Sequence, residues 1–208
     1  MTAVPKRKYT PEEYLELELK APYKSEYFDG EIFPMGDFEG DTPEAMAGAR
    51  SRHNAIKENL SFHIGFHVRK KGGCRSFSSD QRLHIPVNGL YTYPDFLVVC
   101  GKIEFMAGEM ETLTNPIFVA EILSKRTASY DRGEKFEFYR GIPTLREYLT
   151  LDSRRVSVEL WRKTETDLWT LVYETKQVDE RIHLESFALD LTLSDLYAYT
   201  DDLPSAVF

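Results

Sequence analysis

Two acidic residues stand out because each lies in or beside a stretch that is otherwise typical of a buried strand. Asp95 follows Tyr93 and Pro94 at the start of an apolar run, and Glu121 lies inside the apolar segment 117–123. A buried carboxylate without a partner costs several kcal/mol or takes up a proton. Two carboxylates that converge at one end of a sheet offer the oxygen ligands that Mg²⁺ and Mn²⁺ prefer, and these ions assist phosphoryl chemistry. The pair therefore predicts a metal-dependent phosphodiesterase.

Such a reaction also needs a cation near the attacking water or the charge of the transition state. Leu123 stands two residues after Glu121, where a lysine would complete a Glu-x-Lys pair. In the helical segment that follows, Asp131, Lys135 and Tyr139 recur at steps of four and therefore project from one face. We expect Lys135 to reach the site from this helix. A surface ion pair between Asp131 and Lys135 is the alternative interpretation.

Composition limits the class of protein. The chain has 208 residues, of which 42% are apolar and 13% aromatic, which excludes a disordered chain and predicts a single globular domain spanning 1–208. The basic N-terminal residues precede no apolar segment typical of a secretory signal, and no stretch is apolar enough to span a membrane. We therefore expect a cytoplasmic protein.

The formal net charge of -8 argues against a protein that coats nucleic acid by charge alone. It does not exclude an enzyme that acts on nucleic acid, because local basic clusters can steer the substrate. Candidate clusters are Arg50 with Arg52 and Lys57, the run 69–71, and Lys125-Arg126 with Arg132.

The cysteines, Cys74 and Cys100, lie in or beside strand-like segments and have neither a CxxC spacing nor a larger framework around them. This pattern predicts two reduced thiols in the core.

The N-terminal half contains one clear helix start, one clear turn and one long helix. Thr10-Pro11-Glu12-Glu13 is a capping box that predicts a helix over 11–19, and Asp29-Gly30 predicts a hairpin within 27–33. Residues 36–48 are rich in Gly, Pro and acids and predict a loop. Apolar residues at steps of three and four then predict an amphipathic helix from 49 to the glycine pair 72–73.

The C-terminal half predicts a mixed sheet. The expected strands are 75–85, 93–100, 117–123 and 147–151, with a helix over 128–140. A strand, a helix and a strand joined by short connections make strands 117–123 and 147–151 parallel neighbours. Alternating residues over 156–172 predict an antiparallel hairpin with Asp167 near its turn, and Thr192 with Asp195 predicts the start of a last helix.

Taken together, the chain resembles the restriction-endonuclease-like, or PD-(D/E)xK, superfamily. Within it the chain is similar to the Uma-two family, whose members are small bacterial proteins assigned as endonucleases. The resemblance covers most of the chain and is carried by an ordered set: Asp29-Gly30-Glu31, His53, Asp80 with Arg82, Tyr93-Pro94-Asp95, Glu121 to Ser124 with Thr127, Tyr130 to Lys135 with Tyr139, and Glu147-Tyr148.

The resemblance implies an α/β fold with an αβββαβ core, a mixed central sheet flanked by helices, and an added antiparallel C-terminal hairpin. It implies Mg²⁺ or Mn²⁺ held by Asp95 and Glu121 with help from the Ile122 carbonyl, and Lys135 as the catalytic cation. The pocket residues would be Glu31, His53, Asp80 and Asp131. For His53, a core-facing histidine satisfied by a neighbour is the alternative interpretation.

The sequence thus predicts a Mg²⁺-dependent endonuclease that acts on nucleic acid, with DNA as the expected substrate and no membrane partner. Homodimerisation is a further expectation that the superfamily raises. Two alternatives stay open. One is a catalytically silent interaction or regulatory module on the same fold, which the acidic net charge favours; the other is a metal-dependent hydrolase of a small phosphorylated metabolite.

Overall fold

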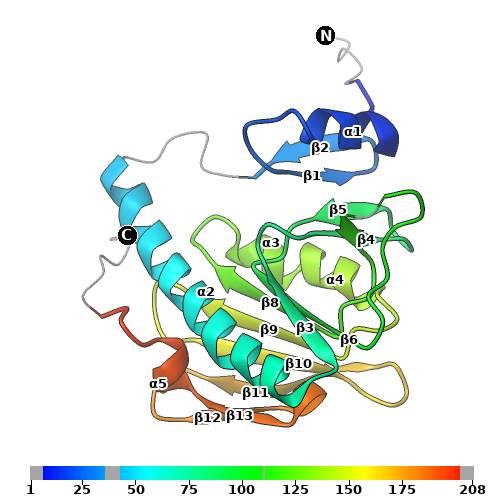
Figure 1. Cartoon of the computed structure of the whole chain (residues 1–208). Coiled ribbons are helices and arrows are strands. Elements are labelled where there is room, and N and C mark those ends of the chain that lie inside the picture. Colours follow the sequence, from blue (N-terminus) through cyan, green and yellow to red (C-terminus); the bar gives the residue numbers. More distant parts are fainter. Residues whose placement is uncertain (1–6, 36–42, 110, 202–208) are drawn as a thin grey trace.

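A six-stranded mixed sheet forms the centre of the protein. The computed structural model describes residues 7–35, 43–109 and 111–201 (Figure 1). Its strand order is β11-β10-β9-β8-β6-β3, and only the β8/β9 pair within it is parallel. The strands are β3 (Cys74–Ser78), β6 (Phe96–Cys100), β8 (Phe118–Leu123), β9 (Glu147–Asp152), β10 (Val158–Lys163) and β11 (Trp169–Thr175).

One face of this sheet is covered by the long helix α2 (Pro43–Lys71). Its side chains Ile56, Leu60, Ile64 and Val68 are buried against the sheet, so the apolar periodicity of the sequence identified the packed face correctly. The same core includes the C-terminal elements, which are β12 (Arg181–Leu184), the 3₁₀ helix η1 (Glu185–Phe187), β13 (Leu189–Thr192) and α5 (Leu193–Leu196).

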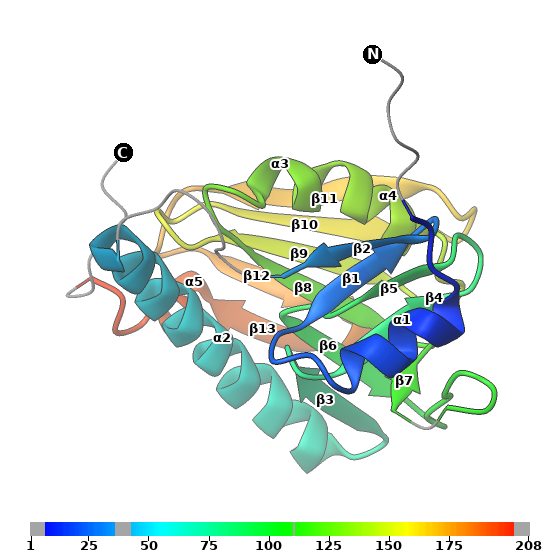
Figure 2. The same ribbon diagram turned by 90° about the horizontal axis from the view of Figure 1, so that it is seen from above.

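The other face is covered by two short helices and a second sheet, so that α2 and the α3–α4 pair lie on opposite sides of the central sheet (Figure 2). The helices are α3 (Ala128–Arg132) and α4 (Glu134–Arg140). The second sheet has the order β2-β1-β5-β4-β7 and adjoins α1 (Pro11–Glu18). Its strands are β1 (Ser25–Phe28), β2 (Glu31–Pro34), β4 (Arg82–Ile85), β5 (Leu90–Thr92) and β7 (Thr112–Leu113).

This architecture confirms the predicted αβββαβ core, which consists of α2, β3, β6, β8, the α3–α4 pair and β9. The predicted parallel pairing of β8 with β9 and the β10/β11 hairpin are both present. Thr10 and Glu13 form the expected capping box. Asp29 and Gly30 have φ of 45° and 80°, as a two-residue hairpin turn with positive φ requires.

Several predicted boundaries were wrong. The single strand expected over 75–85 is two strands in different sheets, because the chain turns where the Gln81 N–H donates to the Ser78 carbonyl at 3.0 Å. Helix α2 begins at Pro43, so the loop prediction fails over 43–48; residues 36–42 lie outside the described residues. The helix expected over 128–140 is interrupted at Gly133, and the β12/β13 hairpin was not predicted.

The prediction of two reduced core thiols was also wrong. Cys74 and Cys100 face each other directly on the antiparallel strands β3 and β6 and form a disulfide. Their spacing in the sequence could not reveal this pairing, because it depends on the register of two strands whose connection passes through the second sheet.

Among the described residues, no helix is long and apolar enough to cross a membrane.

Candidate active site

Asp95 and Glu121 lie side by side at one end of the central sheet. Phe96 of β6 pairs with Ala120 of β8 in antiparallel register, which places the preceding Asp95 beside the following Glu121. The Asp95 N–H donates to Glu121 Oε2 at 3.2 Å, and the Ile122 N–H donates to Asp95 Oδ2 at 2.8 Å. The backbone of Asp95 thus holds the Glu121 carboxyl group, and the backbone of the residue after Glu121 holds the Asp95 carboxyl group.

Helix α2 adds His53 to this end of the sheet. Its Nε2 lies 3.1 Å from Asp95 Oδ2. Burial lowers the pKa of His53, but the charge of Asp95 outweighs this effect and raises it above its usual value. In turn, His53 and the Ile122 N–H hold the pKa of Asp95 below its usual range despite the burial of the carboxyl group. The two side chains thus satisfy each other, and each stabilises the charged form of its partner.

Helix α4 supplies the cation. Lys135 Nζ lies 3.0 Å from Glu121 Oε1 and 3.7 Å from Asp131 Oδ1. The side chains of Lys135 and Asp131 are only 5% and 6% exposed, so the alternative interpretation of a surface ion pair was wrong. Both residues keep their i, i+4 relationship across the interruption at Gly133, where a Cβ would lie 3.0 Å from the Ser129 carbonyl oxygen.

A fourth acid, Glu26 of β1, was missed by the sequence analysis. Its Oε1 lies 3.1 Å from Lys135 Nζ, and its carboxylate also accepts hydrogen bonds from Thr92 of β5 and Tyr130 of α3. Glu26 shares a strand face with Phe28, which packs against Phe138 of α4. Residues two apart in a strand point to the same side, so Glu26 faces the same helix pair as Phe28. This alternation is the signal by which the sequence could have identified Glu26.

The protonation of the cluster follows from burial and pairing. Burial raises the pKa of Glu121 to about 8, although the ammonium of Lys135 opposes the rise. Burial alone would lower the pKa of Lys135, but Glu121 and the neighbouring acids hold it well above its usual range. Burial also raises the pKa of Asp131. Lys135 lowers the pKa of Glu26 against the effect of burial. Lys135 therefore lies among acids of two kinds: burial favours the protonated form of Glu121 and Asp131, whereas pairing with Lys135 favours the ionised form of Glu26.

A hydroxyl group completes the surroundings of Glu121. The Tyr139 hydroxyl donates to Glu121 Oε1 at 2.6 Å, and Tyr139 is fully buried one turn after Lys135 on α4. The Tyr148 hydroxyl of β9 donates to the Asp131 carbonyl at 2.8 Å and ties α3 to the sheet. These contacts fix the helix pair over the sheet end.

One candidate pocket residue, Asp80, lies outside this cluster. Asp80 has a side chain that is 89% exposed and forms a salt bridge with Lys24 at 2.7 Å. Glu31 lies at the turn end of β2 opposite Phe28, while Glu26 on β1 contacts Lys135. The structure therefore brings together His53, Asp95, Glu121, Asp131 and Lys135 with Glu26.

The donor set fits a hard divalent cation. Asp95 and Glu121 present two carboxyl groups at one sheet end, and Mg²⁺ is commonly bound through one or two carboxylates, with water and substrate phosphates as further ligands. Among the described residues, no group of three or more His, Cys, Asp or Glu side chains is arranged to hold a metal ion. Water and the substrate would therefore have to supply most ligands. Ile122, whose carbonyl was expected to help hold the ion, reaches this pair through its N–H, which donates a hydrogen bond to Asp95.

Comparisons with known proteins agree with this geometry at the level of fold and family. The model of the Uma2 family, described as "Putative restriction endonuclease", matches residues 11–195. The crystal structure of a putative nuclease belonging to DUF820 from Anabaena variabilis ATCC 29413 has a TM-score of 0.68 at 20% identity, over 92% of this chain and 99% of that chain. The nuclease-like α/β fold is thus shared with a solved structure.

Two relatives from Synechocystis sp. (strain ATCC 27184 / PCC 6803 / Kazusa) cover nearly the whole chain. The uncharacterized protein slr1290 is 32% identical over 195 residues, which is 94% of each chain. The uncharacterized protein sll1609 is 35% identical over 176 residues, covering 85% of this chain and 91% of the relative. With the match to residues 11–195, the protein belongs to the Uma2 family.

Proposed function

We propose that the protein is a Mg²⁺-dependent endonuclease that hydrolyses phosphodiester bonds in DNA. The observation that carries the proposal is the contact of Lys135 Nζ with Glu121 Oε1 at 3.0 Å, beside Asp95 at the same sheet end. It joins two acids suited to a hard cation with one fixed positive charge. The family description of restriction endonucleases supports the reaction class.

Each residue of the cluster has a distinct role in this proposal. Asp95 and Glu121 would hold the ion, with the Ile122 carbonyl as an additional ligand, and Mg²⁺ when bound supplies Lewis acidity toward the phosphate and an acidified water. Lys135 places its ammonium where it can neutralise charge that develops on the phosphoryl oxygens. His53 orients Asp95 through their contact at 3.1 Å.

Glu26 and Tyr139 are positioning residues. Glu26 holds Lys135 from the side of the second sheet, and Tyr139 holds Glu121 from α4. Because these groups lie on strands and helices rather than on loops, the distance between the cation and the acids is fixed before substrate binds, which reduces the reorganisation needed during the reaction.

A cleavage assay with matched substrates tests the proposal. Supercoiled plasmid DNA, single-stranded DNA, RNA and a small phosphodiester would each be incubated with the protein in Mg²⁺, Mn²⁺ or EDTA. We expect divalent-dependent cleavage of DNA that is lost in Glu121→Gln. Cleavage of the small substrate alone would favour a metabolite hydrolase. Binding of DNA without cleavage in any ion would favour the silent module.

A further inference from the structure

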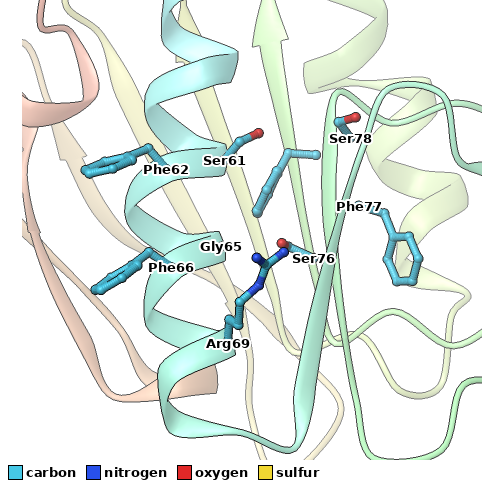
Figure 3. A pocket seen from close by; sticks show the side chains of 9 residues that line it. Ser61, Phe62, Gly65, Phe66, Arg69, Ser76, Phe77 and Ser78 are labelled. Atoms are coloured by element: carbon cyan, nitrogen blue, oxygen red, sulfur yellow. The ribbon is translucent and has the colours of Figure 1, made fainter.

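A polar hollow lies between α2 and the edge strand β3. Its volume is about 370 Å³, which is within the range of small-ligand sites. The lining side chains that carry polar groups come from both elements and are Ser61, Arg69, Ser76 and Ser78 (Figure 3). None of these residues belongs to the acidic cluster described above.

The helix side of the hollow continues as a stripe of residues four apart. His53, Lys57, Ser61, Gly65 and Arg69 follow one another at this spacing and therefore form one ridge on the surface of α2, inclined to the helix axis. In Figure 3, Ser61 and Arg69 point toward β3, whereas the rings of Phe62 and Phe66 point away from it. Lys57 Nζ lies 3.3 Å from the Ser79 hydroxyl, just beyond the end of β3. The stripe thus joins the hollow to His53.

The strand side connects the hollow to the candidate active site. Ser76 and Ser78 lie on the face of β3 that α2 covers, and Ser78 pairs with Phe96, the residue after Asp95. Gly65 lets the helix approach closely, since a Cβ there would lie 3.0 Å from the Ser76 hydroxyl oxygen. The groove formed by this stripe and β3 therefore begins at the Asp95 end of the sheet.

We propose that the groove between α2 and β3 binds the sugar-phosphate backbone of a nucleic acid strand that continues from the bond being cleaved. Lys57 and Arg69 contact phosphates, and the hydroxyl groups of Ser61, Ser76 and Ser78 donate hydrogen bonds to phosphate oxygens. This inference rests on the proposed nuclease function and extends it, because it assigns the substrate a path along the protein.

The dimensions and charge of the groove suit this occupant. From His53 to Arg69 the helix rises about 24 Å, at 1.5 Å per residue, which corresponds to about seven base steps of 3.4 Å along the axis of B-form DNA. The chain carries a formal net charge of -8 and repels a polyanion in general, so binding requires cations grouped along one line. The stripe provides them next to the acids.

The salt dependence of DNA binding, compared between the wild-type protein and Arg69→Gln, tests this path. The affinity for fluorescent DNA of about 20 nucleotides, single- and double-stranded, would be measured by anisotropy in EDTA over a range of salt concentrations. Each lost phosphate contact should reduce the slope of log K against log[salt] by about 0.7 for single strands and 0.9 for duplex. Lys57→Gln should have the same effect, and the double variant about twice the effect.

Arg75→Gln is the matched control. Arg75 of β3 pairs with Val99 of β6, so it lies on the sheet face opposite α2. Its substitution removes the same charge as Arg69→Gln or Lys57→Gln. An unchanged slope in Arg75→Gln with reduced slopes in the two groove variants supports the path. Equal changes in all three variants, or none, overturn it. If the wild-type protein binds no nucleic acid, the path fails, and the cleavage assay in Mg²⁺ or Mn²⁺ decides the nuclease function separately. Binding that follows the predicted pattern without cleavage rejects the function alone.

Discussion

Lys135 of α4 contacts Glu121 of β8 at 3.0 Å, although Leu123 occupies the position in the strand where a Glu-x-Lys pair would place its lysine. The helix therefore delivers the cation from outside the sheet. Glu26 holds the same ammonium from the other side at 3.1 Å. The ammonium group of Lys135 is thus fixed between two acids that belong to two different sheets.

Lys135→Ala should reduce Mg²⁺-dependent cleavage by about 10²-fold or more, the loss typical of removing one electrostatic stabiliser. It should also destabilise the fold by about 3 kcal/mol, because Glu26 and Glu121 would be left buried without their cation. Cleavage would be measured at a temperature where circular dichroism shows the variant folded. Activity within about threefold of wild type would reject this role for Lys135. Lys8→Ala removes an exposed ion pair and should change neither quantity measurably.

Glu26→Gln should lower kcat more than it changes KM, because Glu26 touches Lys135 and not the substrate in the proposed site. Glu12→Gln, which changes an exposed acid on α1, is the matched control and should leave both constants unchanged. If the two variants behave alike in steady-state kinetics, Glu26 has no specific part in positioning the lysine.

Local patterns identified the acids and the lysine because each signal was confined to one segment. Glu121 is conspicuous among apolar neighbours, and Lys135 follows from the i, i+4 spacing to Asp131. The central sheet could be predicted for the same reason, since β8, α3–α4 and β9 follow one another in the chain.

The parts that the sequence did not reveal depend on packing between distant segments. Glu26 becomes part of the site only because the second sheet packs over α4, which brings together residues more than 100 positions apart, as the contact with Tyr130 shows. Asp80 belongs to the same ordered motif as Asp95, yet the turn that separates β3 from β4 carries it to the surface, where it pairs with Lys24.

Reduction of the Cys74–Cys100 disulfide should lower the free energy of unfolding by about 3.5 kcal/mol. The bond closes a loop with a sequence separation of 26 residues, and the chain-entropy relation gives this magnitude. Urea unfolding with and without reductant measures the change, and non-reducing mass spectrometry reports the bond itself. A Cys74→Ser/Cys100→Ser variant should match the reduced protein and lose its response to reductant. Equal stability in both redox states would contradict the expectation.

His84 should make the protein less stable as the pH falls. Burial lowers its pKa below the ordinary value of 6.5, so the unfolded chain takes up a proton at a higher pH than the folded protein does. The stabilisation is therefore complete above 6.5 and is lost as the pH falls through the folded pKa. His84→Phe would preserve the stacking on Tyr91, whose ring centroid lies 4.1 Å away. The melting temperature of His84→Phe should depend less steeply on pH in this range than that of the wild-type protein. The same pH dependence in both proteins would rule out His84 as the source of this loss of stability.

Divalent cations should stabilise the folded protein if Asp95 and Glu121 form the proposed metal site. An ion that binds only the native state raises the free energy of unfolding by about 2.7 kcal/mol when its concentration is a hundred times the dissociation constant. Thermal melting with and without Mn²⁺ measures this effect without requiring any substrate. The Asp95→Asn/Glu121→Gln variant should lose the shift. Asp80→Asn also removes an acid, but one that is exposed and outside the cluster, so it should retain the shift. An equal response in all three proteins would place ion binding elsewhere, and no response in the wild-type protein would remove the basis for a metal site between these two carboxyl groups.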